Sequence, residues 1–365
     1  MKLTQVQTML ERRIRLGDYL LKDMPGEREL AEEAGVSRMT VRKAVLNLIN
    51  TGILQRDTNG RVTMNRKRAE HPARIAFLAP CLSSTDFERW RLALDALAKE
   101  FTAVTRTLLY AHWDDPVLLD AIERFDGVFI LPIAEPVPGR IVDRLCEARE
   151  AVVILGQDMI AQGLRSIRLL PPAATHRLLD LLAELGHRRI DCFNVQHVDR
   201  SIEERIDQWK LWRAAHRMPG QLLGQPVQQP ASPVTEAFQQ MRGILDRDEL
   251  ETTALLCTTA SSAIGAVRAL HSRGYKVGHD VSICVVNDEN IARMFSPSLT
   301  SLEMHDPTPY LSLCLTQMQR HHDGWAGSLL MQPTDVPLFI GESTGPPARK
   351  PITDCDNVKK VKASL

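Results

Sequence analysis

Basic and small polar side chains recur at helical spacing between residues 38 and 43. Arg38, Arg42 and Lys43 carry positive charge within two turns of a helix, and Met39 and Thr40 lie between them. Guanidinium and ammonium groups bind phosphate oxygens and the acceptor edge of guanine, while hydroxyl and apolar groups contact other base edges. This combination of residue types predicts a surface that binds DNA.

A helix-turn-helix would hold these side chains on one face. In this motif two helices cross closely, and the turn between them needs a residue without a bulky Cβ. Ala31 falls at the crossing and Gly35 at the turn, and Ser37 is suited to cap the second helix through its hydroxyl. Apolar residues at positions i, i+3, i+4 and i+7 of that helix share one face and are expected to be buried. They are Val41, Ala44, Val45 and Leu48.

The first 65 residues are predicted to form three helices and a hairpin. The first helix covers 4–16, the second follows Pro25-Gly26 and ends at Ala34, and the third begins after Ser37. Two short strands then flank Asn59-Gly60, and Asn-Gly is a strong hairpin signal because both residues tolerate a positive φ. This order of elements is typical of a winged helix-turn-helix.

The run PGERELAEEAGVSRMTVRKA resembles the GntR-type winged helix-turn-helix. The resemblance implies that arginines of this run contact DNA and that the small residue at the wing tip approaches the minor groove. Gly26 stands where the family usually has a serine cap, and the wing reads NGRVT in place of the usual G-x-G-T. The predicted DNA-binding residues are Arg28, Ser37, Arg38, Met39, Thr40, Arg42, Lys43, Gly60 and Arg61.

The charge distribution agrees with a basic head on an acidic body. The chain holds 45 Lys and Arg and 45 Asp and Glu, yet residues 1–68 hold 14 basic and 8 acidic side chains. A basic module joined to an acidic remainder suits a DNA-binding part attached to a part that binds something else.

From residue 74 short apolar runs alternate with amphipathic stretches, as in RIAFLAP, GVFILPI, AVVILG, TALLCT and SICVV. Continuous apolar strands separated by helices predict an α/β fold of doubly wound parallel sheets covered on both faces. About 270 residues exceed one sheet, so two lobes are expected. The predicted division is a DNA-binding domain at 1–65, a linker at 66–73, lobe 1 at 74–171 and 289–325, lobe 2 at 172–288 and 326–345, and a disordered tail at 346–365.

Residues 74–345 resemble the type I periplasmic-binding-protein fold of LacI-type repressors. The stretches that carry the resemblance are LLAELGHRRIDCF, CTTASSAIGAVRALHSRGYKVGHDVSICVVNDEN, SPSLTSLEM and GEST. The resemblance implies two lobes around a cleft that binds a small effector, with Arg205 at the family's effector-binding arginine. The family's Asn-Asp pair is Thr259-Ala260 here, and its ligand-binding aspartate is Asn287.

The expected effector is small and polar, either sugar-like or anionic. The loop after the first strand supplies further polar groups, and Trp113 could either stack on a ring or pack in the core. An Arg205 that only pairs with Glu203 or Asp207 is the alternative to ligand binding. The predicted effector-binding residues are Ser83, Ser84, Asp86, Phe87, Trp113, Arg205, Thr259 and Asn287.

These features together predict a cytoplasmic, homodimeric transcription regulator, a repressor, that binds an operator in double-stranded DNA. The alternative is a DNA-binding regulator whose effector domain has lost its ligand and binds a partner. Seven scattered cysteines, no metal-ligand spacing and no G-x-S-x-G or phosphate-binding loop argue against an enzyme, a metal site or a cofactor. The sequence also lacks an apolar run long enough to span a membrane.

Overall fold

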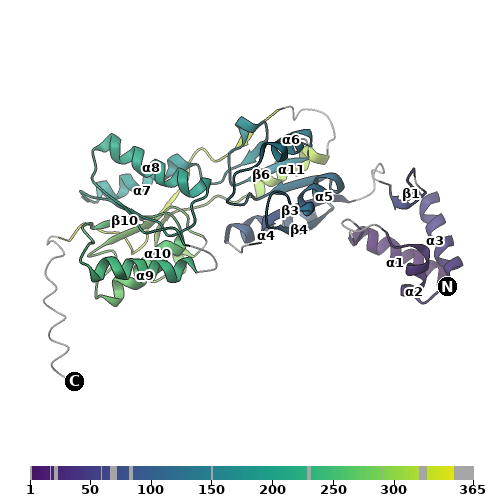
Figure 1. Cartoon of the computed structure of the whole chain (residues 1–365), viewed down its shortest axis with the longest axis horizontal. Helices are drawn as coiled ribbons and strands as arrows, with labels where there is room; N and C mark the ends of the chain where they lie inside the picture. The colour runs from purple at the N-terminus through teal and green to yellow at the C-terminus, as the bar shows by residue number, and fades with distance from the viewer. Residues whose placement is uncertain are drawn as a thin grey trace, which may run out of the picture. The chain divides into compact units, whose positions relative to one another are not determined.

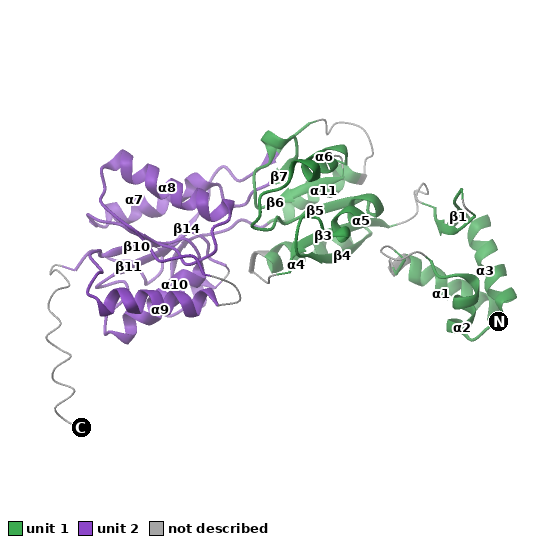
Figure 2. Cartoon of the chain, in the orientation of Figure 1, with its two compact units in different colours: residues 1–166, 307–329 green, residues 167–306, 330–365 purple. Residues whose placement is uncertain are grey.

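The computed structural model describes residues 2–16, 18–19, 24–58, 60–65, 72–81, 85–148, 151–227, 232–289, 291–319 and 327–348. It divides into two compact units, which Figure 2 shows in different colours. Unit 1 comprises residues 1–166 and 307–329, and unit 2 comprises residues 167–306 and 330–365. Among the described residues, no helix combines the length and apolarity that a membrane crossing requires.

The N-terminal part of unit 1 has three helices and a two-stranded hairpin (Figure 1). The elements are α1 (Lys2–Leu16), α2 (Glu27–Ala34), α3 (Arg38–Asn50), β1 (Leu54–Arg56) and β2 (Val62–Met64), and the two strands pair antiparallel. Gly35 ends α2 with a φ of 59°, a left-handed conformation that glycine adopts without strain. Ser37 caps α3 by accepting the N–H of Thr40. The predicted cap and turn are therefore present.

The rest of unit 1 holds most of a six-stranded sheet with the order β13-β7-β6-β5-β3-β4, in which β7 crosses the boundary of the unit and β13 falls just beyond it. Its strands are β3 (Ala73–Pro80), β4 (Ala103–Tyr110), β5 (Gly127–Ile130), β6 (Val152–Leu155), β7 (Arg165–Ile167) and β13 (Leu330–Met331). The helices are α4 (Thr85–Glu100), α5 (Pro116–Arg124), α6 (Gly139–Glu147) and α11 (Thr308–Gln319). β5 and β6 are buried along their whole length, as the uninterrupted apolar runs predict.

Unit 2 contains a second six-stranded sheet with the order β14-β12-β11-β10-β8-β9. Its strands are β8 (Asp191–Phe193), β9 (Leu222–Leu223), β10 (Ala254–Cys257), β11 (Ser282–Val285), β12 (Thr300–Leu302) and β14 (Leu338–Phe339), and only β14 is paired antiparallel. Helices α7 (Thr175–Glu184) and α8 (Arg200–His216) cover one face, and α9 (Pro233–Asp246) and α10 (Ala260–Ser272) cover the other (Figure 1).

Two features of unit 2 differ from the sequence prediction. Residues 289–306, expected in lobe 1, belong to unit 2, because β12 pairs with β11 and completes the second sheet. The chain returns to unit 1 only at Pro307. The sequence analysis did not predict helix α9. Its apolar side chains pack against α10, and this contact fixes its place in the unit.

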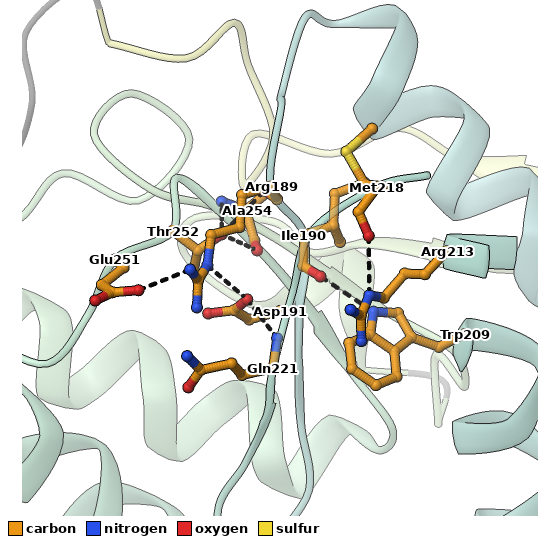
Figure 3. Close-up of polar contacts among 10 residues, drawn as sticks. All are labelled: Arg189, Ile190, Asp191, Trp209, Arg213, Met218, Gln221, Glu251, Thr252 and Ala254. Atoms are coloured by element: carbon orange, nitrogen blue, oxygen red, sulfur yellow. Dashed lines mark hydrogen bonds and ion pairs between the residues drawn. The ribbon is translucent and has the colours of Figure 1, made fainter. Parts of the chain in front are cut away.

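A buried carboxylate holds the amino edge of the second sheet (Figure 3). Asp191 begins β8, is almost completely buried, and accepts hydrogen bonds from Arg189 Nε at 3.0 Å and from the Gln221 N–H at 2.8 Å. Burial raises the pKa of Asp191, and these two donors oppose that rise. Trp209 packs nearby in the core and donates its indole N–H to the carbonyl of Ile190, as expected for a core residue.

His187 fastens the segment after β14 to the same sheet. Its ring is buried, with Nδ1 2.8 Å from Thr253 Oγ1 and Nε2 3.0 Å from the carbonyl oxygen of Gly345. An Nε2–H that donates to Gly345 leaves Nδ1 to accept from the threonine hydroxyl. Burial lowers the pKa of His187, so the neutral ring is the form that fits this position.

We predict that acid destabilises unit 2 through His187. The unfolded chain takes up a proton near the ordinary pKa of 6.5, whereas the folded chain takes it up only at lower pH, so stability falls as the pH drops below 6.5. Urea unfolding at pH 7.5 and 5.5 checks this in the wild type and in His187→Gln. The variant should lose less free energy of unfolding between the two pH values, and an equal loss would contradict the assignment.

We also predict opposite effects for two glycines within helices. A Cβ at Gly265 of α10 would lie 2.4 Å from Ala237 Cβ and 2.6 Å from the Val234 carbonyl oxygen, so Gly265→Ala should cost about 1–3 kcal/mol of stability. At Gly243 of α9 the nearest atom is the flexible end of Arg247, and Gly243→Ala should be neutral or gain up to about 1 kcal/mol. Thermal unfolding of both variants is the measurement, and equal melting temperatures would exclude a close α9–α10 contact.

Candidate DNA-binding surface and effector site

Helix α3 separates its residues into a buried face and an exposed face. Val41, Ala44, Val45 and Leu48 are all buried against α1, α2 and β1. The side chains of Arg42 and Lys43 are therefore exposed on the opposite side, and Met39 is 59% exposed although it is apolar. Leu46, 40% exposed, lies on the same face, and an exposed, basic helix face with two large apolar side chains has the composition needed to contact phosphates and base edges.

Two of the predicted arginines already have carboxylate partners. Arg38 Nε lies 3.5 Å from Glu27 at the start of α2, and Arg28 Nε lies 3.2 Å from Glu32 one turn further along the same helix. All but Glu27 of these side chains are largely exposed, so the two ion pairs add little stability and can exchange for phosphate contacts. Arg42 and Lys43 make no ion pair within the described residues.

The hairpin places Gly60 and Arg61 at its tip. Gly60 has a φ of 78°, and its carbonyl accepts a hydrogen bond from Arg56 Nη1 at 2.9 Å. The N–H of Arg61 donates to Asp57 Oδ1 at 2.8 Å, which closes the turn. Asn59, the other residue of the predicted hairpin signal, lies outside the described residues.

Arg205 lies at the carboxyl edge of the second sheet. Its Nη1 donates to the carbonyl of Thr258, just beyond β10, at 2.7 Å. The Thr258 hydroxyl donates in turn to Asn194 Oδ1, just beyond β8, at 2.5 Å. β9 and β10 lie on opposite sides of β8, so the chain changes direction here, and ligands of open α/β sheets bind outside such a point. The pairing of Arg205 with Glu203 or Asp207 is not what the structure shows.

Thr259 and Asn287 lie at the same edge, and the side chain of each accepts a hydrogen bond from a backbone N–H. Thr259 caps α10, with its hydroxyl accepting the Ser262 N–H at 3.3 Å. Asn287 is buried after β11, and its Oδ1 accepts the Glu289 N–H at 3.1 Å. Asn194 and Thr258 are two polar residues at this edge that the sequence analysis did not select. Their positions directly after the apolar strands β8 and β10 could have indicated them.

The predicted effector residues of unit 1 have different outcomes. Trp113 is a correction: its ring is buried in the core against Tyr110 and its N–H donates to the Glu135 carbonyl at 2.9 Å, so it offers no face to a ligand. Phe87 stacks on Phe77 with ring centroids 5.5 Å apart. Ser83 and Ser84 lie outside the described residues, as does the side chain of Asp86.

The cysteines are mostly inert by position. Cys192, Cys257, Cys284 and Cys314 are buried, and burial raises the pKa of each thiol. Within the described part of the chain, His, Cys, Asp and Glu side chains form no group of three that could hold a metal ion.

Two families match separate parts of the chain. Residues 2–63 match the bacterial regulatory proteins of the gntR family, and residues 179–307 match the periplasmic binding protein-like domain. The chain combines a GntR-type winged helix-turn-helix with a periplasmic-binding-protein-like domain. This is the make-up of a DNA-binding transcription regulator, and it agrees with both resemblances found in the sequence.

Similar curated proteins are regulators. The HTH-type transcriptional repressor NagR of Bacillus subtilis is 50% identical over 54 residues, which are 14% of this chain and 22% of NagR. The HTH-type transcriptional regulator TreR of Salmonella typhimurium is 21% identical over 296 residues, which are 76% of this chain and 87% of TreR. The first similarity is thus confined to about a fifth of its relative, and the second extends over most of both chains.

Solved structures with the same fold are LacI-type repressors. The Lac repressor dimer bound to operator and the anti-inducer ONPF matches with a TM-score of 0.62 and 18% identity over 76% of this chain and 95% of that chain. A LacI family regulator from Enterococcus faecium with bound ribose matches with a TM-score of 0.62 and 18% identity over 75% and 99%. At these identities the likeness confirms the fold of the α/β part.

Proposed function

We propose that this DNA-binding regulator is a homodimeric repressor that binds an operator through α3 and releases or engages it in response to a small polar effector. The observation that carries the DNA-binding part is the division of α3, whose apolar residues are buried while Met39, Arg42 and Lys43 are exposed. Such a face can enter the major groove while flanking arginines bind phosphates.

The effector part of the proposal rests on the carboxyl edge of the second sheet. Arg205, Asn194 and Thr258 form a connected polar cluster at the point where the strand order reverses. An arginine presents a planar fork of donors that suits hydroxyl pairs, carboxylates and phosphates. The Ser83–Phe87 segment follows β3 in the sequence, and its contact with the same effector stays a prediction. Solved structures of similar fold hold ribose or ONPF, which supports a small polar ligand.

We expect Arg38→Ala and Arg42→Ala each to weaken DNA binding by about 1–3 kcal/mol without unfolding the protein, because each removes a phosphate or base contact from an exposed side chain. Fluorescence anisotropy with a duplex that the wild type has selected from a random pool is the measurement. It is made at two salt concentrations, since a lost phosphate contact also flattens the salt dependence.

Arg12→Ala is the matched control, because Arg12 is an exposed arginine of α1 and its loss changes the net charge equally. A loss of affinity of the same size in all three variants would mean that the change in net charge, and not a contact made by α3, causes the loss. Unchanged affinity of both α3 variants would mean that α3 is not the recognition helix.

We expect the full chain to be a dimer. One small winged domain contacts too few base pairs for useful specificity, and a palindromic operator requires a two-fold protein. Light scattering at micromolar concentration should give twice the 41.0 kDa mass of the chain without DNA, and that mass plus one duplex with DNA. A mass of one chain without DNA, and of one chain plus one duplex with DNA, would contradict the proposal.

A further inference from the structure

Arg168 is a buried cation that lies one residue after β7. Its backbone N–H donates to the Met331 carbonyl at 2.9 Å, and its side chain is only 8% exposed. One of its Nη atoms lies 3.3 Å from Glu204 of α8, but its Nε is buried and has no hydrogen-bond partner among the described residues. A buried guanidinium with an unsatisfied N–H is costly, so this position favours an additional acceptor.

Glu204 does not neutralise Arg168 alone. Arg200, one turn earlier on α8, also lies 3.3 Å from the same Glu204 oxygen. Two guanidinium groups thus share one carboxylate, and the cluster of Arg168, Arg200 and Glu204 keeps an excess positive charge. In a buried position this charge is screened less than on the surface.

The neighbouring carboxylates do not remove this excess. Asp199 caps α8 by accepting the Ile202 N–H at 2.8 Å, and Glu203 is exposed to solvent. Asp288 and Glu289 follow β11, which is separated from β8 by β10. The positive charge is therefore local to the side of the edge where α8 begins.

Further donors at this edge are unused. Arg205 is the residue next to Glu204, and its contact with Thr258 engages a neutral carbonyl and one of its five N–H groups. Helix α7 precedes β8 and runs antiparallel to it, so α7 begins at the same edge, where a 3-10 turn (Pro172–Ala174) leads directly into the helix. Thr175 in its first turn is fully buried, and neither its hydroxyl nor His176 Nε2 has a hydrogen-bond partner among the described residues. Buried polar groups without a partner favour an additional hydrogen-bonding ligand at this edge.

We propose that the effector carries an oxyanion, a carboxylate or a phosphate, and that Arg168 and Arg205 bind this group where α7 and α8 begin. The inference rests on the proposed effector-binding function and narrows it to an anionic ligand. Arg168 donates its free Nε–H to the oxyanion while its Nη atom keeps the contact with Glu204. Arg205 donates its remaining N–H groups to the same oxyanion. Neutral sugars would leave the Arg168 Nε–H and the excess charge unsatisfied.

The test measures the melting temperature of the full-length protein with inorganic phosphate, glucose 6-phosphate, gluconate, glucose and ribose, at constant ionic strength set with sodium chloride. Wild type is compared with Arg168→Gln, Arg205→Gln and the control Arg217→Gln. Arg217 is an exposed arginine just beyond the other end of α8. The phosphate arms and the gluconate arm distinguish the two oxyanions.

The proposal expects a saturable rise of the melting temperature with phosphates or with gluconate, and a smaller rise or none with the neutral sugars. Arg168→Gln should raise the apparent Kd for the anion about tenfold to a hundredfold, the loss expected for a hydrogen bond to a charged group, and Arg217→Gln should leave it unchanged. Arg168→Gln should also be as stable as the wild type in chloride alone, because Arg200 still pairs with Glu204.

Three outcomes would overturn the proposal. They are a response to neutral sugars only, an anion response that Arg168→Gln retains, and no response to any anion. DNA binding by the same protein preparations is measured in parallel by anisotropy. If one of these three outcomes is found and the protein still binds DNA, the anion assignment fails and the proposed DNA-binding function stays in place. If the protein does not bind DNA, the proposed function itself fails.

Discussion

The parallel pairing of β10 with β8 on one side and with β11 on the other is the constraint on which the second unit depends. Strands that are paired in this way and covered by helices on both faces must all end at one edge, and the helices that follow them must begin there. Asn194, Thr258 and Asn287 come from three separate parts of the chain, yet each lies within two residues of the end of one of these strands. The same geometry brings the beginnings of α7, α8 and α10 to that edge, which makes it rich in backbone and side-chain donors.

The buried charged groups at the two edges of this sheet differ in whether their hydrogen-bonding atoms have partners. At the amino edge Asp191 is buried, and Arg189 and the Gln221 N–H satisfy its oxygens, so the group fixes β9 beside β8. At the carboxyl edge Arg168 is buried with an N–H left free, and Glu204 is shared. A satisfied buried charge adds structural definition, whereas an unsatisfied one is the arrangement expected of a group that binds a ligand.

In the N-terminal part the constraint is the small size of the domain. The core of three short helices and a hairpin takes one face of α3, formed by Val41, Ala44, Val45 and Leu48, so the residues of the opposite face remain at the surface. The recognition surface is therefore a direct consequence of packing. The same argument explains why Met39 is exposed, since its position on α3 is opposite to Val41 and Ala44 on the helical wheel.

The sequence by itself determined the local features of this protein. The turn at Gly35, the cap at Ser37, the buried face of α3 and the buried strands follow from the spacing of a few residue types, because these depend on neighbours within one or two turns. The position of Arg205 near Thr258, the burial of Trp113, the assignment of β12 to the second sheet and the shared carboxylate of Arg168 and Arg200 required the tertiary structure. Each depends on residues that are more than 20 positions apart in the chain or on the order of strands in a sheet, and the spacing of residues along one segment carries no information about either.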